Sequence, residues 1–190
     1  MSTPTRVVHT AAGTLLATEH LARRLDEAGA ARTGYLTSHL VATPEPRYVM
    51  VLDHTDELAA RATEELPGLT RVPAARDVVL LLTDVSDDHR AAARSAVHEH
   101  RTRHSGRLLR YPGRTAIERR LTVREVIARS CVDEVAGLAG VDVTPDTMLD
   151  LTGFARPTWH EGRCRLLVQP GRIGLIPFEV RDQVSCCADH

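Results

Sequence analysis

The chain of 190 residues is predicted to adopt an α/β fold: a mainly parallel sheet flanked by helices, then a C-terminal antiparallel β-hairpin and an irregular tail. Through 1–140, short apolar runs typical of strands alternate with amphipathic stretches typical of helices, which is the pattern of layered α/β proteins. Beyond this point the helical periodicity stops and turn-forming residues become frequent. We therefore expect an α/β domain over 1–140 and, over 141–190, a β-hairpin appendage with a Cys/His tail packed on the same domain.

The first predicted unit is a strand over 6–10 followed by a helix over 14–28. Leu21 and Leu25 recur at helical spacing among smaller apolar residues, which gives the helix one apolar stripe. Gly29 is expected to end it.

Two strands are predicted next, over 34–42 and 47–52, and the second is the more apolar. The chain then enters a predicted helix whose acidic first turn complements the partial positive charge of a helix N-terminus. Pro67-Gly68 ends this helix.

The third unit contains the most apolar run of the chain, Val-Val-Leu-Leu-Leu, within 77–82. Such a run suits a central parallel strand that is covered on both faces. A helix rich in Ala, Arg and His follows to about Arg103, with Ser86 as its N-cap. A fourth strand is expected over 107–111.

The last predicted helix begins at a capping box, in which Thr122 precedes Glu125 by three positions. Apolar residues at helical spacing extend this helix to Gly140. Beyond it, 163–168 and 173–180 are expected to pair as a hairpin around a Pro-Gly turn.

The basic residues of the chain restrict its chemistry. All 24 are Arg and none is Lys, so a pyridoxal phosphate Schiff base and a P-loop nucleotide site are both excluded. The net charge of −1 lacks the basic excess of a general nucleic-acid binder, and we expect no nucleic-acid partner. An Arg-rich segment over 101–124 is compatible with an anion-binding face, although an ordinary solvated surface also explains it.

The sequence contains no apolar run near the roughly 20 residues that a membrane span needs. Its N-terminus also lacks the pattern of a signal peptide. We therefore expect a cytoplasmic protein without a membrane partner, in which the four Cys are reduced.

Acidic and imidazole side chains follow the predicted strands. His9 lies at the end of the first strand, Asp53 and His54 follow the strand over 47–52, and Asp84 follows the most apolar strand. Since the carboxyl ends of parallel strands meet at one sheet edge, these side chains are expected to converge there. They suit acid–base catalysis or a divalent cation, with Asp84 as the catalytic carboxylate and His54 and His9 as its partners. The alternative stays open that acids such as Asp53 only cap helices.

Three residues are expected to bind an anionic substrate. Arg110 and Arg114 provide guanidinium groups, which can bind a carboxylate or a phosphate through two parallel hydrogen bonds. Thr14 lies at a predicted helix start, where backbone N–H groups can bind phosphate without a lysine.

The tail is a candidate site for a divalent metal such as Zn, or for thiol exchange, through Cys186, Cys187 and His190. Cys164 or His160 could complete such a site. Adjacent Cys rarely direct both sulfurs to one ion, and chain ends are often mobile, so packing or chance is the alternative.

Other chemically active residues have simpler interpretations. His100 and His104 lie on one helical face at a spacing that can bind Zn, and His98 lies nearby, but a solvated helix face is preferred. Trp159, the single Trp, is expected to pack the hairpin on the sheet rather than to line a pocket. Cys131 is expected in the core.

The leading hypothesis is a cytosolic small-molecule enzyme that acts on an anionic metabolite at the strand-end site, with or without a metal ion. The alternative is a non-catalytic metal- or thiol-responsive binding protein that uses the tail. A third possibility is a regulatory partner protein that uses the Arg-rich segment. The edges of a small sheet are also compatible with a homodimer.

Overall fold

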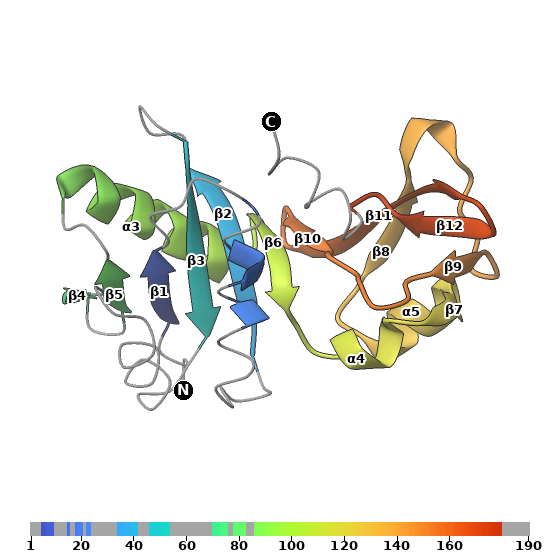
Figure 1. Cartoon of the computed structure of the whole chain (residues 1–190), viewed down its shortest axis with the longest axis horizontal. Helices are drawn as coiled ribbons and strands as arrows, with labels where there is room; N and C mark the ends of the chain where they lie inside the picture. The colour runs from blue at the N-terminus through green and yellow to red at the C-terminus, as the bar shows by residue number, and fades with distance from the viewer. Residues whose placement is uncertain are drawn as a thin grey trace.

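The computed structural model describes residues 5–9, 15, 18–20, 22–23, 34–41, 46–53, 70–75, 78–82 and 86–179, with 5–9, 70–75 and 78–82 described by their backbone alone. One lobe contains a sheet and a long helix, and the other is a smaller β-rich structure (Figure 1). We call them the N-terminal half, up to residue 110, and the C-terminal half, from residue 111.

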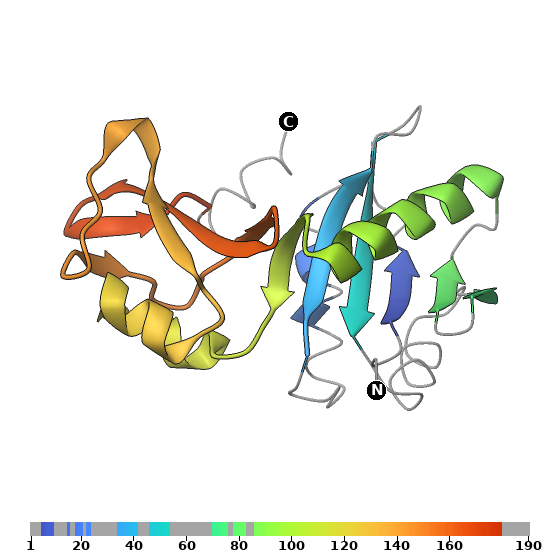
Figure 2. The ribbon, with the colours of Figure 1, turned by 180° about the vertical axis from the view of Figure 1, so that it is seen from behind.

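The N-terminal half contains six described strands and one long helix. In chain order these are β1 (Thr5–His9), β2 (Leu36–Val41), β3 (Arg47–Asp53), β4 (Thr70–Ala75), β5 (Val78–Leu82), α3 (Asp87–Thr102) and β6 (Ser105–Arg110). Residues 18–20 and 22–23 are also helical and lie on the opposite side of the sheet from α3 (Figures 1 and 2).

The C-terminal half consists of short elements. They are α4 (Arg114–Ile117), β7 (Arg120–Thr122), α5 (Val123–Arg129), β8 (Glu134–Gly137), a 3-10 turn (Leu138–Gly140), β9 (Met148–Asp150), β10 (Thr158–His160), β11 (Arg163–Gly171) and β12 (Gly174–Pro177). The strands of both halves form one 12-stranded sheet in the order β4-β5-β1-β3-β2-β6-β10-β11-β12-β9-β7, with β8 beside β11.

The prediction of a mainly parallel sheet flanked by helices is wrong. Among the described strands, β1–β5, β8–β11 and β9–β12 pair parallel, whereas the other eight pairings are antiparallel. The reason lies in the connections: only 42–46 separate β2 from β3, and only 76–77 separate β4 from β5. A parallel pair needs a crossover of a dozen residues or more, so connections this short force antiparallel hairpins.

The positions of the individual strands were predicted more accurately than the way in which the strands pair. The strands expected over 6–10, 34–42, 47–52, 77–82 and 107–111 are confirmed as β1, β2, β3, β5 and β6 within one or two residues at each end. The predicted C-terminal hairpin is also confirmed, because β11 and β12 pair antiparallel up to Gly171 and Gly174. The helix predicted after the strand over 47–52 lies outside the described residues.

The helix expected to end near Arg103 is confirmed as α3, with Ser86 as its N-cap. Small side chains form the middle of its buried face, where Ala92, Ala93 and Ala96 pack on Val49 and Val51 of β3, behind the sheet in Figure 1. No helix in the described ranges has the length and apolar character needed to cross a membrane.

The helix predicted to run to Gly140 is shorter than expected. Its capping box is confirmed, since Thr122 and Glu125 bond each other's backbone N–H. The helix nevertheless ends at Arg129, and Val135 lies in β8, opposite Leu166 of β11. Apolar residues that continue a helical spacing are here buried by strand pairing instead, because β11 offers a ladder partner.

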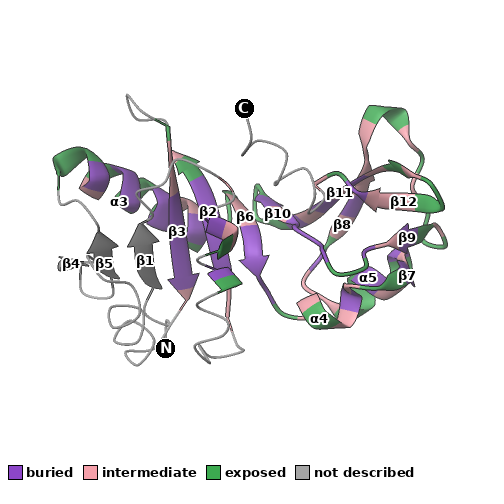
Figure 3. Ribbon diagram, viewed as in Figure 1, coloured by how far each residue is buried: buried purple, intermediate pink, exposed green. Residues whose placement is uncertain are grey.

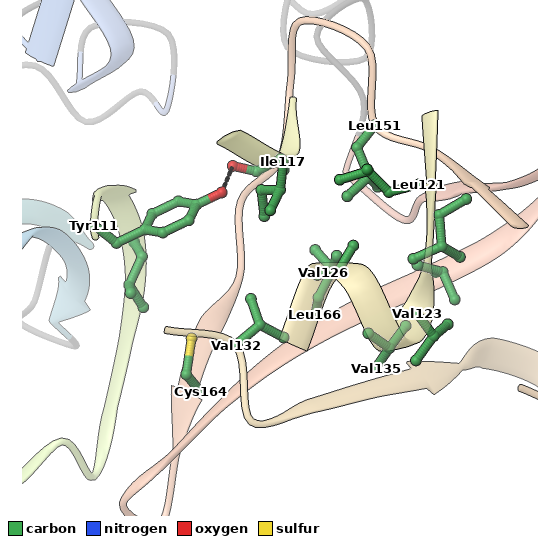
Figure 4. Packing of buried hydrophobic residues seen from close by; sticks show 14 of the residues in the cluster. Tyr111, Ile117, Leu121, Val123, Val126, Val132, Val135, Leu151, Cys164 and Leu166 are labelled. Carbon is green, nitrogen blue, oxygen red and sulfur yellow. Dashed lines mark hydrogen bonds between the residues drawn. The ribbon is translucent and has the colours of Figure 1, made fainter. Parts of the chain in front are cut away.

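Buried residues occur in both halves (Figure 3). An apolar core of the C-terminal half forms where buried side chains of α5, β8 and β11 meet (Figure 4). Val126 of α5 and Leu166 of β11 are almost fully buried within it. Tyr111 borders this core, and its hydroxyl donates to the Ala155 carbonyl at 3.1 Å.

The two halves are joined by backbone pairing and by buried ion pairs. β6 and β10 pair antiparallel, with Gly106 opposite Trp159. Beside this ladder, Glu19 accepts hydrogen bonds from Arg156 at 3.0 Å and from Arg107 at 2.5 Å. Burial would raise the pKa of Glu19, but the two guanidinium groups outweigh it and lower the pKa from 4.5 to about 2. The carboxylate of Glu19 therefore connects the N-terminal helical residues to both β6 and the C-terminal half.

Replacing Glu19 by Gln is expected to lower the free energy of unfolding by about 2–3 kcal/mol, because two largely buried guanidinium groups lose a shared carboxylate. Since the folded pKa is lowered, this contribution is complete above about pH 4.5 and is lost as the pH falls toward about 2. Urea unfolding at about pH 7 measures the loss. The control Asp146→Asn removes an exposed ion pair with Arg124 and should change stability by well under 1 kcal/mol. Equal effects of the two substitutions would contradict this role of Glu19.

Candidate functional site

Four hydrogen-bonded side chains connect β3, α3 and β2. His100 Nε2 donates to Asp53 Oδ1 at 2.9 Å, and His100 Nδ1 lies 2.8 Å from the Thr37 hydroxyl. The same hydroxyl lies 2.7 Å from His39 Nε2. We refer to Asp53, His100, Thr37 and His39 as the Asp-His-Thr-His chain.

Local structure explains how these side chains meet. Strand alternation places Thr37 and His39 on one face of β2. The small residues of α3 allow the helix to lie close to the sheet, and His100 follows Ala96 by one turn on the same helical face. His100 therefore reaches the β2 side chains, while Asp53, at the end of β3, meets the other side of its ring.

Most of the Asp-His-Thr-His chain is buried. Thr37 is 0%, His100 3% and His39 4% exposed, whereas the side chain of Asp53 retains 27% exposure. Solvent therefore reaches the chain at its carboxylate end.

The order of donors and acceptors follows from the carboxylate, which can only accept when ionised. One arrangement that meets this condition has His100 Nε2–H directed at Asp53, His100 Nδ1 accepting from the Thr37 hydroxyl, and the Thr37 oxygen accepting from His39 Nε2–H. This arrangement leaves His39 Nδ1 as a bare acceptor, and no hydrogen-bond partner for that atom is found among the described residues. The hydroxyl of Thr37 thus links two imidazoles that would otherwise each need a separate buried partner.

The surroundings of the chain move two pKa values. Burial, reinforced by His100, lowers the pKa of His39 from 6.5 to about 3, so this ring stays neutral at physiological pH. Burial would raise the pKa of Asp53, but the hydrogen bond from His100 and the Tyr35 backbone N–H outweigh it and hold the pKa below its usual value. Asp53 is therefore ionised at neutral pH.

Aromatic rings and one cation cover the carboxylate end. The Trp159 ring packs edge-on against His100 with centroids 5.0 Å apart, and Tyr35 lies 5.0 Å from Trp159. The exposed Arg103 places its guanidinium 5.1 Å from the Tyr35 ring centroid. Its positive charge also lowers the pKa of Asp53. The exposed rim of the site thus combines a carboxylate, a phenol and a guanidinium.

A glycine is required beside His39. Gly106 has φ +130°, and a Cβ atom on it would lie 2.6 Å from His39 Cε1. That separation is far below van der Waals contact, so the His39 ring occupies the space that a side chain in β6 would need. Gly106 thereby allows β6 to pair with both β2 and β10 around the buried ring.

Most residues of the predicted strand-end, substrate-binding and tail metal sites lie outside the described residues. Thr14, His54, Asp84, Cys186, Cys187 and His190 lie outside the described residues, and His9 is described only by its backbone. The expected convergence rested on parallel neighbours, and β1 and β3 are antiparallel, so residues that end these two strands lie at opposite edges of the sheet.

The two arginines predicted to bind substrate lie in protein contacts. Arg110 is buried at the end of β6. Arg114 donates to Glu118 at 2.8 Å and to the Leu109 carbonyl at 3.0 Å. The substrate-binding role of these two arginines stays a prediction.

The histidine prediction holds in part. His98 and His104 are exposed, as expected, but the solvated interpretation is wrong for His100, which is buried against β2. Sequence reasoning also missed Thr37 and His39. The available signal was the run Thr37-Ser38-His39 inside a predicted strand, in which alternation places Thr37 and His39 on one face.

Other candidate sites are weaker in the described ranges. They contain no group of three or more His, Cys, Asp or Glu side chains close enough to hold a metal ion. A shallow pocket beside α5 is lined by Val123, Arg124, Ile127 and Pro145, which include no acid–base group. The Asp-His-Thr-His chain is therefore the strongest candidate for chemistry.

No family model, curated protein or solved structure matches this chain. We therefore infer a function from the geometry of the site itself.

The neutral, buried His39 predicts a loss of stability in mild acid. Its folded pKa of about 3 lies below the ordinary 6.5, so below about pH 6.5 the unfolded chain binds a proton that the folded chain does not. This adds about 1.4 kcal/mol of destabilisation per pH unit down to about pH 3. Urea unfolding between about pH 7.5 and 4.5 should show a shallower pH slope for His39→Leu than for the wild type.

The exposed His98 provides the control, since His98→Gln should keep the wild-type slope. A His39→Leu protein with the wild-type pH slope would show that His39 titrates normally in the folded state.

Proposed function

We propose that this chain is a cytosolic enzyme acting on a small anionic metabolite, with Asp53 as its acid–base group and Arg103 as the cation that binds the substrate. The observation that carries the proposal is the Asp-His-Thr-His chain, in which three buried polar groups orient one carboxylate that reaches solvent. Burying such groups is unfavourable unless they are mutually hydrogen-bonded, and perturbed pKa values of this kind concentrate at functional sites.

Asp53 is suited to receive a proton from a bound substrate. His100 occupies Oδ1, whereas Oδ2 has a long contact of 3.4 Å with the Tyr35 backbone N–H. Oδ2 is thus the more weakly bonded oxygen of an oriented carboxylate. A substrate hydroxyl or amine beside Oδ2 would pass its proton to Oδ2 as its oxygen or nitrogen forms a bond to an electrophilic centre and displaces that centre's leaving group, while His100 keeps the carboxylate in place.

Arg103 supplies the anion preference. Its guanidinium stacks on Tyr35 and Trp159, and no ion pair of Arg103 is found within the described part of the chain. Stacking on the rings leaves the edge of the guanidinium able to donate two parallel hydrogen bonds to a carboxylate or phosphate. A metabolite with an anionic group and a nearby ionisable hydroxyl or amine therefore fits this rim.

The proposal predicts that two substitutions separate binding from turnover. A panel of carboxylates and phosphate esters is screened for a rise in melting temperature of the full chain, and turnover of each hit is followed by mass spectrometry. Arg103→Gln should weaken binding of the hits about 10-fold or more. Asp53→Asn should retain binding and lower turnover by about 100-fold or more.

The exposed Arg124, which pairs with Asp146 far along the chain from this site, gives the matched control Arg124→Gln, expected to bind as the wild type does. The proposal fails if no compound in the panel binds, if Arg103→Gln binds every hit normally, or if Asp53→Asn turns them over at the wild-type rate. Circular dichroism of each variant verifies that it is folded.

A further inference from the structure

Two free thiols lie in contact at the base of the C-terminal half. Cys131 follows the end of α5, Cys164 lies on β11, and their Sγ atoms are 3.7 Å apart. Two sulfurs at this distance are in van der Waals contact, and they need to approach by less than about 2 Å to reach the length of a disulfide bond.

The backbone around the two sulfurs holds them together. Asp133 donates its N–H to the Cys164 carbonyl at 2.8 Å, and the Cys164 N–H donates to Asp133 Oδ2 at 2.8 Å. On the other side, the Cys131 N–H donates to the Pro112 carbonyl at 3.2 Å. Because the β8–β11 ladder begins directly afterwards, the thiol contact is built into the strand arrangement.

The close approach of this segment depends on Gly113. A Cβ atom on Gly113 would lie 2.2 Å from the Arg129 carbonyl oxygen, and its φ is +83°. Only glycine therefore lets the chain before α4 pass against the segment that carries Cys131.

The two thiols differ in the way that a reactive and a resolving Cys differ. Cys131 is partly exposed, whereas Cys164 is 3% exposed. Hydrogen bonds from Cys164 and from the Tyr35 hydroxyl lower the pKa of Cys131, while the contact with Cys131 and burial raise the pKa of Cys164. The more accessible sulfur is therefore the one that ionises more readily, which favours its oxidation.

We propose that Cys131 and Cys164 form an oxidisable thiol pair that hydrogen peroxide converts into a disulfide between the segment after α5 and β11. The Cys131 thiolate attacks one peroxide oxygen, the O–O bond breaks, and the departing hydroxide takes a proton to become water. Cys131 is then a sulfenic acid. Cys164 attacks the Cys131 sulfur, the S–S bond forms, and the second hydroxide leaves with the Cys164 proton as water. Two thiols lose two electrons, and one peroxide gains them.

The fluorescence of Trp159, which packs against Tyr35, can report this reaction. Trp159, the single Trp of the chain, lies opposite Cys164 in the β10–β11 ladder, and Tyr35 contacts both the Cys131 thiol and the Trp159 ring. Disulfide formation removes the thiol that Tyr35 contacts and places a disulfide beside the indole. The emission of Trp159 should therefore change on oxidation and return on reduction.

The test uses the full chain with Cys186→Ser and Cys187→Ser as background, so that only the proposed pair carries thiols. About one equivalent of peroxide should remove both thiols, lower the mass by about 2 Da, join the Cys131 and Cys164 peptides and change Trp159 emission, all reversed by dithiothreitol. Cys131→Ala should slow loss of the remaining thiol more than 10-fold. Cys164→Ala should instead leave a Cys131 sulfenic acid that dimedone traps.

The natural chain, with all four Cys, provides the comparison for specificity. The proposal is overturned if Cys131 and Cys164 stay reduced under peroxide, if Cys131 joins a tail Cys in preference to Cys164, or if both sulfurs oxidise beyond sulfenic acid without linking. The proposal is also overturned if, in the protein with Cys186→Ser and Cys187→Ser, adding Cys131→Ala does not slow the reaction of the remaining thiol with peroxide. If Cys164→Ala does not fold, Cys131→Ala alone still decides which sulfur reacts.

Discussion

The short ladder between β6 and β10 is the contact on which both halves of the molecule depend. It places Trp159 opposite Gly106, and from there the indole reaches His100 in the N-terminal half and lies beside Cys164 in the C-terminal half. The same junction brings Arg156 to Glu19, so the backbone pairing is accompanied by charges that stay paired out of water. A larger residue in place of Gly106 would clash with the buried His39 ring and strain the backbone of β6, and so would weaken the pairing of β6 with β10.

Thr37, His39 and His100 are stabilised inside the N-terminal half by the hydrogen bonds that they share with one another and with Asp53. Burying a hydroxyl or imidazole without a partner costs several times the free energy that one hydrogen bond contributes. Removing Thr37, His39 or His100 would therefore also destabilise the residues that it bonds. Their joint effect is to fix one carboxylate, Asp53, in a single orientation at the surface. A carboxylate held in one orientation is what the proposed acid–base role of Asp53 requires.

Local patterns predicted the elements of this fold well and their assembly poorly. An apolar run such as that of β3, or the capping box at Thr122, carries its own information, because neighbouring residues decide strand, helix start and turn. The direction in which strands pair depends instead on the length of connections and on distant partners. The same apolar run therefore supported a parallel sheet as readily as the antiparallel one that forms.

The candidate site shows the same division. Asp53 was recognisable as an acid at a strand end, but its partner comes from the far end of α3, where helical spacing alone suggested a solvated histidine. Synthesis from the N-terminus adds a consequence of this separation. Thr37 precedes His100 by 63 positions, and Trp159 comes later still, so β2 leaves the ribosome before the groups that satisfy its buried side chains exist. We therefore expect the nascent N-terminal half to stay incompletely folded, and accessible to chaperones and proteases, until β10 has been synthesised.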